Sequence, residues 1–184
     1  MPELFQGYCI DTAPLIDLYR RKYPPDIFPG VLIEIETLVK EGVLVAPRQV
    51  LRELEDYEER KKREEQTEEP DKLLEWAKRH KKMFINPDES ENNYMGIATQ
   101  IINEIIPGYG KTLVDEEKEK EDADPFVIAL AKLRGWVVIN SESSNPPNLN
   151  ARPKIPDVCA YHKVECIDLL EFFRRQKWVF RHQG

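Results

Sequence analysis

The chain has 184 residues, a formal net charge of -7 at pH 7 and a pI of about 5.2. That length suits one ordinary domain with its own core. The acidic excess argues against sequence-independent binding of nucleic acid over the whole surface, which needs a surplus of Lys and Arg. A local basic rim around an acidic site can still hold a phosphate chain.

The cysteine pattern and the apolar runs bear on the compartment. Cys9, Cys159 and Cys166 stand singly, with no CxxC spacing, so we expect buried structural thiols in a reducing cytoplasm rather than a disulfide framework. No stretch reaches the roughly 18 apolar residues of a membrane helix, and Met1 to Gly7 lacks the pattern of an export signal. We therefore expect a cytoplasmic protein that is neither exported nor inserted into a membrane.

The amino-terminal half predicts strands that alternate with helices. An apolar run over 7–10 predicts a strand that ends before Asp11, and helical spacing of apolar residues follows as far as Tyr19. Next come a helix that ends near Gly42, a buried strand over 43–46 and a helix that begins at Pro47. Residues 55–69 are dominated by Glu, Lys and Arg, which indicates an exposed continuation of that helix or a mobile loop. Further helices are predicted over 70–83 and 93–106.

The carboxyl-terminal half continues the alternation after an acidic connector over 115–122. Residues 126–133 are apolar nearly all round, which predicts a central buried helix. The remaining predicted elements are a strand over 136–139, a long Pro-, Asn- and Ser-rich loop over 143–153, a helix over 156–161, a strand over 164–167 and a helix over 168–175. Together they predict an α/β fold, a three-layer sandwich with a mostly parallel central sheet of four or five strands. We expect a single domain over 1–184, with a helical insertion around 55–106.

Four acidic residues are predicted to gather at one end of this sheet, because ligands bind outside the carboxyl ends of parallel strands. Asp11 and Glu142 follow predicted strands, Glu53 lies near the start of the helix after the second strand, and Asp124 begins the buried helix. Each residue alone also has an ordinary structural explanation. Asp124 before a proline is typical of a helix N-cap, Glu53 can flank an amphipathic helix, Asp11 can start a turn, and Glu142 can be an exposed loop acid. The prediction therefore rests on the combination.

Four segments in this order resemble the PIN-like nuclease family, which includes the VapC-type toxin ribonucleases. The segments are Cys9–Ile16, Ala46–Leu54, Asp122–Ala131 and Val137–Glu142. The Asn- and Pro-rich loop and residues 154–159 resemble a larger, poorly characterised branch of that family. The chain departs from the common pattern at Asn140, where Thr or Ser is frequent, and at Glu142, where Asp is frequent.

The resemblance implies a divalent-metal-dependent endoribonuclease that hydrolyses phosphodiester bonds of RNA, as the toxin of a toxin-antitoxin pair. Mg²⁺ or Mn²⁺ would be held by Asp11, Glu53, Asp124 and Glu142, with Thr12, Asn140 and Asp122 supporting them. Oxygen ligands suit these ions, and crowded carboxylates should show raised pKa values without a cation. Cations that flank the acids, namely Arg48, Arg52, Arg152 and Lys154, are the candidates for binding RNA. The resemblance also implies an antitoxin protein as a partner and a homodimer.

Other chemistries find less support. His80, His162 and His182 lack the spacing of a zinc site, and the loops typical of nucleotide kinases, dinucleotide enzymes and α/β-hydrolases are missing from the sequence. A phosphatase with Asp11 as nucleophile would need an acid two residues later, where Ala13 stands. The remaining alternative is a catalytically weak or inactive PIN-like module that binds a protein. A basic and aromatic carboxyl-terminal segment would serve such docking, with Arg174, Arg175, Lys177, Trp178, Phe180 and Arg181.

Overall fold

The computed structural model describes residues 7–65, 70–86, 93–114 and 122–180. Its centre is a five-stranded sheet with the order β3-β2-β1-β4-β5, in which every pair of neighbours is parallel. The strands are β1 (Tyr8–Ile10), β2 (Leu44–Pro47), β3 (Phe84–Ile85), β4 (Val137–Ile139) and β5 (Cys166–Ile167). The first strand in sequence is therefore the central one in space.

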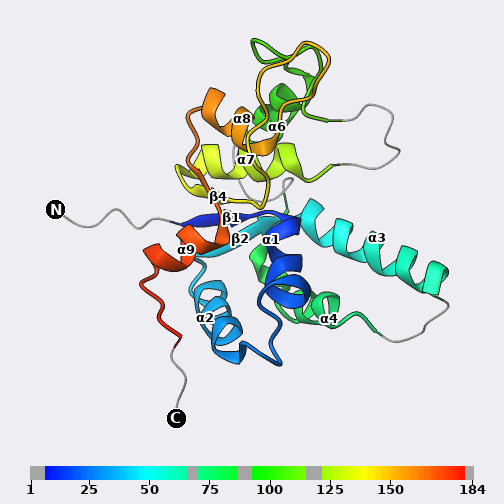
Figure 1. Ribbon diagram of the computed structural model, residues 1–184, viewed down its shortest axis with the longest axis vertical. Helices are drawn as coiled ribbons and strands as arrows, with labels where there is room; N and C mark the ends of the chain where they lie inside the picture. The colour runs from blue at the N-terminus through cyan, green and yellow to red at the C-terminus, as the bar shows by residue number, and fades with distance from the viewer. Residues whose placement is uncertain (1–6, 66–69, 87–92, 115–121, 181–184) are drawn as a thin grey trace.

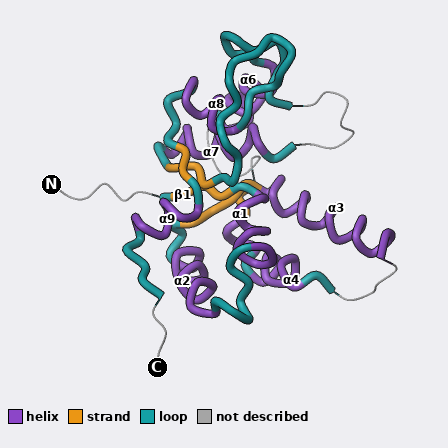
Figure 2. The backbone as a smooth tube through the Cα atoms, in the orientation of Figure 1, coloured by secondary structure: helices purple, strands orange, loops and turns teal. Residues whose placement is uncertain are grey.

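Helices cover both faces of the sheet, as Figures 1 and 2 show. One face carries α6 (Tyr94–Asn103), α7 (Asp124–Arg134) and α8 (Ile155–Tyr161). The other side carries α1 (Thr12–Ile16) with its continuation η1 (Asp17–Arg21), α2 (Pro29–Lys40), α3 (Arg48–Glu65), α4 (Lys72–Arg79), the short turn η2 (Lys81–Met83) and α9 (Leu169–Arg175). The prediction of an α/β three-layer sandwich is confirmed.

The buried helix α7 is the centre of the core on its face of the sheet. Its residues from Pro125 to Ala131 are all buried, in agreement with the apolar composition that predicted a central helix. It lies between the sheet and α6, and the hydroxyl of Tyr94 on α6 donates to the carbonyl of Phe126 at 3.0 Å. This packing fixes the amino-terminal end of α7, where Asp124 stands.

Two predictions within residues 55–106 need correction. The helix predicted over 70–83 ends at Arg79, and Phe84–Ile85 then forms the edge strand β3, so this insertion is not helical throughout. The apolar residues Met83, Phe84 and Ile85 follow directly on the helical pattern and are ended by Asn86 and Pro87, so the sequence did not separate this short strand from the helix. For the charged segment, the exposed helix continuation is right as far as Glu65; residues 66–69, like most of the acidic connector, lie outside the described residues.

The long loop after β4 is tied to the segment that follows α6. Tyr109 donates its hydroxyl to the carbonyl of Asn145, and the Arg152 guanidinium donates to the carbonyls of Thr112, at 3.4 Å, and Val114. Gly110 lies so close to the backbone of Leu149 that a side chain has no room there. The loop predicted over 143–153 is therefore packed against its neighbour rather than hanging in solvent.

Within the described part of the chain, we find no helix that is both long and apolar enough to span a lipid bilayer.

Replacement of Gly110 by Ala should loosen this loop. A methyl group at Gly110 would overlap the carbonyl oxygen of Leu149, so we expect a loss of about 1–3 kcal/mol in the free energy of unfolding. Thermolysin should then cut the loop near the exposed Leu149 faster than in the wild type. Gly42→Ala is the control, because Gly42 has a φ of +71° but open space around it. Its strain should lower the melting temperature without faster cutting near Leu149, and equal cutting in both variants would contradict the packing argument.

Candidate functional site

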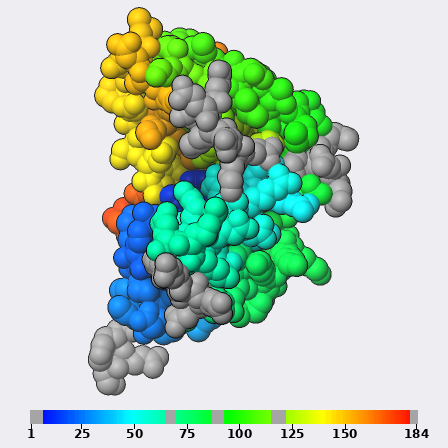
Figure 3. Space-filling model, turned by 90° about the vertical axis from the view of Figure 1, so that its right-hand side faces the viewer, coloured from blue at the N-terminus to red at the C-terminus, as the bar shows by residue number. Residues whose placement is uncertain are grey.

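The candidate site lies at the carboxyl ends of β1 and β4. Asp11 follows β1 directly, is only 5% exposed, and is anchored by its backbone N–H, which donates to the carbonyl of Ile139 at 3.0 Å. The backbone N–H groups of Thr12 and Ala13 at the start of α1 lie close enough to its carboxylate to lower its pKa. Asp11 is the single residue between the end of β1 at Ile10 and the start of α1 at Thr12, which keeps it at the carboxyl end of the strand. Figure 3 shows this face, where the blue start of the chain, the cyan start of α3 and the yellow segment after β4 meet.

Electrostatic repulsion links the predicted acids to one another. Burial, the charge of Glu53 and, more weakly, that of Glu142 raise the pKa of Asp11 to about 7, against the lowering effect of the nearby Thr12 and Ala13 backbone. Burial raises the pKa of Asp124 well above its usual range, and the charges of Asp11, Asp122, Glu53 and Glu142 add to that effect. The structure thus brings the four predicted acids, with Asp122, into one electrostatically connected group.

Glu53 joins three helices at this site. Its Oε2 accepts the hydroxyl of Thr12 at the start of α1, and its Oε1 accepts the backbone N–H of Ala123, next to the start of α7, at 3.0 Å. Thr12, which the sequence analysis placed in support of the acids, contacts Glu53 directly. Glu53 therefore lies inside the group, although it is one of many Glu residues in its part of the sequence.

The carboxylate of Glu142 accepts hydrogen bonds from two residues at the start of α8. Lys154 Nζ donates to Oε1 at 3.1 Å, and the backbone N–H of Ile155 donates to Oε2 at 3.2 Å. Asn140 accepts the backbone N–H of Glu142 at Oδ1 and donates from Nδ2 to Cys166 Sγ at 2.8 Å. The side chains of Glu142 and Lys154 are 31% and 48% exposed, so this ion pair is accessible from solvent.

The donor chemistry fits a hard divalent cation, but the carboxylates are not gathered around one point. Among the residues that the structure describes, no group of three or more His, Cys, Asp or Glu side chains could hold an ion as they stand. Glu53 and Glu142 are turned toward hydrogen-bond donors of the chain itself. Asp11 and Asp124 are the pair whose raised pKa values a cation would relieve, so they are the first candidates to hold one.

The cations predicted to bind RNA fall into two groups. Arg48 and Arg52 are exposed on the first turns of α3, the helix that carries Glu53. Arg152 donates to backbone carbonyls of the neighbouring segment, and Lys154 pairs with Glu142. Their partners lie far away in the sequence, so the sequence could not show that these two side chains already have structural contacts.

The sequence analysis missed Asp17, a buried acid beside the site. It is 2% exposed, pairs with Arg21 at 2.9 Å and Lys22 at 2.8 Å, and accepts the hydroxyl of Ser141 at 2.8 Å. Burial raises its pKa, but the hydrogen bonds from Lys22 and Ser141 and the two positive charges outweigh that effect, so the pKa is lowered overall. An acid between Ile16 and Leu18, with Arg21 four residues on, was the available signal.

Asp157 was also missed, although its segment was part of the resemblance. Its carboxylate accepts the backbone N–H groups of Lys154, at 2.7 Å, and Asn145, at 3.1 and 3.2 Å, and also the hydroxyl of Ser144. It closes the long loop against the first turn of α8. The signal for this capping role was an acid at the second residue of the predicted helix over 156–161, directly after a proline.

The burial predicted for the cysteines is confirmed for two of the three. Cys9 and Cys159 are buried, whereas Cys166 on the short edge strand β5 is partly exposed, and all three are free thiols. The edge position explains the difference, because one side of an edge strand lacks a neighbouring strand to cover it.

Asp11→Asn and Asp17→Asn should change stability in opposite directions in metal-free protein. A folded pKa near 7 against an ordinary value of 3.8 means that native Asp11 binds its proton more tightly than the unfolded chain does. The stabilisation that protonated Asp11 gives the folded protein is therefore complete below about pH 4 and is lost as the pH rises toward 7. At pH 7.5 we expect Asp11→Asn to raise the free energy of unfolding by about 2–4 kcal/mol, a gain that vanishes near pH 4.

Asp17→Asn is the matched control for that measurement. Because the folded pKa of Asp17 is lowered, its contribution is present at neutral pH and is lost in acid, so the substitution should cost about 1–3 kcal/mol at pH 7.5. Urea unfolding in chelator at several pH values measures both variants. A loss of stability in Asp11→Asn at pH 7.5 would contradict the repulsion described for the site.

Comparison with known proteins gives one match. The family model described as "Domain of unknown function (DUF4411)" matches residues 8–180. No curated protein matches the chain significantly, and no solved structure does. The matched range runs from β1 to beyond α9 and includes all four candidate acids. The chain therefore belongs to the DUF4411 domain family.

Proposed function

We propose that this protein is a divalent-metal-dependent endoribonuclease of the PIN-like type, which hydrolyses phosphodiester bonds of RNA in the cytoplasm. One observation carries the proposal. Asp11, buried at the carboxyl end of the central strand, has a pKa near 7 because burial and neighbouring carboxylates oppose its charge. A protein that keeps such a destabilising group at the open end of a parallel sheet has a use for negative charge at that point.

Mg²⁺ or Mn²⁺ is the proposed cofactor, because the donors are carboxylate oxygens. Asp11 and Asp124 would hold it, with Glu53, Glu142 and Asp122 completing or supporting the site. When bound, such an ion polarises a phosphodiester and lowers the pKa of a coordinated water. Thr12 and the Ala123 amide orient the carboxylate of Glu53, and Asn140 fixes the backbone from which Glu142 extends.

The proposed substrate is single-stranded RNA, held by cations near the acids. Arg48 and Arg52 are the best placed candidates, because both are exposed on the helix that carries Glu53. Backbone phosphates are recognised by such charges without regard to base sequence. Lys154 would reach RNA only after release from Glu142, and Arg152 would act by holding the loop.

We further propose that the ribonuclease is a toxin held in check by an antitoxin protein and that it can form a homodimer. The described carboxyl-terminal segment supports a protein partner. Leu170, Val179 and Phe180 expose large apolar side chains there, in the same segment as the basic residues Arg174 and Lys177. Exposed apolar side chains together with basic ones suit an acidic amphipathic partner. Arg181 lies outside the described residues.

The second candidate function is a PIN-like module that binds a protein without cutting RNA. The observation that favours it is the ion pair of Glu142 with Lys154, which supplies a positive charge from the chain itself where a metal ion would otherwise be needed. If that ion pair persists in solution, the acidic residues have a structural role, and the carboxyl-terminal segment is the surface that binds the protein partner. Metal uptake separates the two candidates.

RNA cleavage is the direct test of the enzyme. The wild type should cut a mixed set of labelled single-stranded RNAs with Mn²⁺ or Mg²⁺ and lose this activity in chelator. Asp11→Asn should lower cleavage at least about 100-fold, because it removes the central negative charge of the site. Glu59→Gln, an exposed carboxylate on the same helix as Glu53, is the matched control and should cut at the wild-type rate. Absence of cutting together with absence of Mn²⁺ uptake by calorimetry would favour the binding module.

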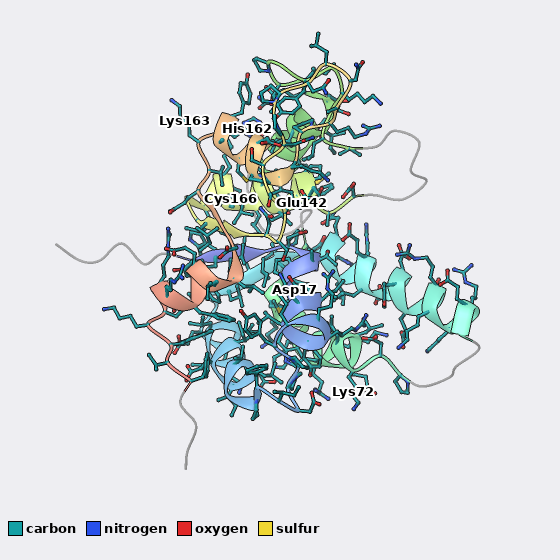
Figure 4. All side chains as sticks on the ribbon, viewed as in Figure 1. Asp17, Lys72, Glu142, His162, Lys163 and Cys166 are labelled. Carbon is teal, nitrogen blue, oxygen red and sulfur yellow. The ribbon has the colours of Figure 1, made fainter. Side chains whose placement is uncertain are left out.

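Lys154→Met tests whether the ion pair competes with metal. Without the ammonium group, Glu142 gives up no salt bridge when it turns to a cation, so the dissociation constant for Mn²⁺ should fall by up to about fivefold. Lys72→Met is the control, since Lys72 is exposed at the start of α4, at the foot of Figure 4 and far from Glu142. Unchanged affinity in Lys154→Met would mean that Glu142 takes no part in metal binding.

A further inference from the structure

Two cysteine thiols lie against each other next to the candidate site. Cys159 is buried on α8 and Cys166 is partly exposed on β5, two elements in contact with each other, and each thiol shifts the pKa of the other. The chain between them reverses sharply, with the N–H of Val164 donating to the carbonyl of Cys159 at 2.8 Å and Lys163 at a φ of +57°. This turn brings the start of β5 back under α8.

The surroundings make the two thiols unequal. Cys166 Sγ accepts a hydrogen bond from Asn140 Nδ2 at 2.8 Å. The neighbouring Cys159 thiol lowers the pKa of Cys166, burial raises it, and the bond from Asn140 lowers it again, so the pKa is below its ordinary value. Cys159 is buried. A partly exposed cysteine whose sulfur accepts an amide hydrogen bond, beside a buried thiol, is the arrangement of an attacking cysteine and its resolving partner.

We propose that Cys166 and Cys159 are a modification site at which hydrogen peroxide forms a reversible disulfide within the chain. In the first step the Cys166 thiolate attacks the peroxide oxygen, the O–O bond breaks, and the products are a sulfenic acid and hydroxide. In the second step the sulfur of Cys159 attacks the sulfenic sulfur, its proton leaves with the hydroxyl group as water, and the S–S bond forms. The two sulfurs are oxidised and the peroxide is reduced.

The side chain of Asn140 connects the cysteine pair to Glu142. Asn140 donates to Cys166 from Nδ2 and accepts the backbone N–H of Glu142 at Oδ1. The β4–β5 pairing holds its backbone, since the N–H of Asn140 donates to the carbonyl of Ile167 at 3.0 Å. Once the disulfide has formed, Cys166 Sγ is no longer a thiolate that accepts the hydrogen bond from Asn140. The Asn140 side chain is then free to move, and its hydrogen bond with the backbone N–H of Glu142 is weakened. A consequence for RNA cleavage rests on the proposed function, whereas the disulfide itself does not.

The disulfide is tested on the intact wild-type chain with hydrogen peroxide. Thiol titration should fall from three cysteines to one, and thiol reductant should restore all three. Trypsin cuts after Lys163, between the two cysteines, so mass spectrometry should show the Cys159 and Cys166 peptides joined, with the loss of two hydrogen atoms. Cys166→Ser should abolish the joined product, and Cys9→Ala should keep it. Three remaining thiols, or sulfinic acid on Cys166 with no link to Cys159, would overturn the proposal.

Hydrogen exchange tests the connection to Glu142 without any RNA or metal. Oxidation should speed exchange at the Glu142 amide about fivefold, the effect of losing one ordinary hydrogen bond. Peroxide should have no such effect in Cys166→Ser. A disulfide that forms while the exchange of Glu142 stays constant would refute the connection through Asn140. Both readouts are independent of cleavage, so failure of the proposed ribonuclease activity would leave them unchanged.

Discussion

Repulsion between buried carboxylates is the constraint on which the rest of this site depends. Asp11 and Asp124 both have raised pKa values, because burial deprives their charges of water and the neighbouring acids oppose them. The chain offsets part of this cost with backbone N–H groups at the start of α1 and with the position of Asp124 at the first residue of α7, where the helix dipole favours negative charge. The cost that remains is large enough that a role for the charge is the simplest reason to keep it.

The strand order explains why these acids meet. From β1 the chain builds outward through β2 to β3, then returns to the other side of β1 with β4 and β5. The strand order reverses between β1 and β4, and the carboxyl ends of the strands at such a reversal are where open parallel sheets bind their ligands. Asp11 and Glu142 follow these two strands. Glu53 joins the helices beside them, since it accepts hydrogen bonds from Thr12 and Ala123.

The sequence predicted the parts of this structure that depend on local pattern. Apolar runs identified β1, β2, β4 and β5, and the run of apolar residues over 126–133 predicted the helix α7, whose residues from Pro125 to Ala131 are buried. The acids at the ends of these strands and helices could be placed because the ends of the apolar runs mark them. The edge strand β3 was missed because its apolar residues follow directly on a helical pattern, and the contacts of Arg152 and Lys154 were missed because they join different segments of the chain. Asp17 was passed over because its partner Ser141 lies on another element.

Glu142 differs from the other acids in what holds it. Asp11 is fixed by the main chain of β4, whose Ile139 carbonyl accepts its backbone N–H, and Glu53 by a hydroxyl and an amide of packed helices. Glu142 accepts one backbone N–H, from Ile155, but its other partners are an exposed lysine and an asparagine that also contacts the Cys166 thiol. These are the partners that the proposed metal, RNA or peroxide would change. Exposed ion pairs are weak, so such changes cost little. Control of this site is therefore expected at Glu142, while the buried pair Asp11 and Asp124 stays in place and supplies the charge.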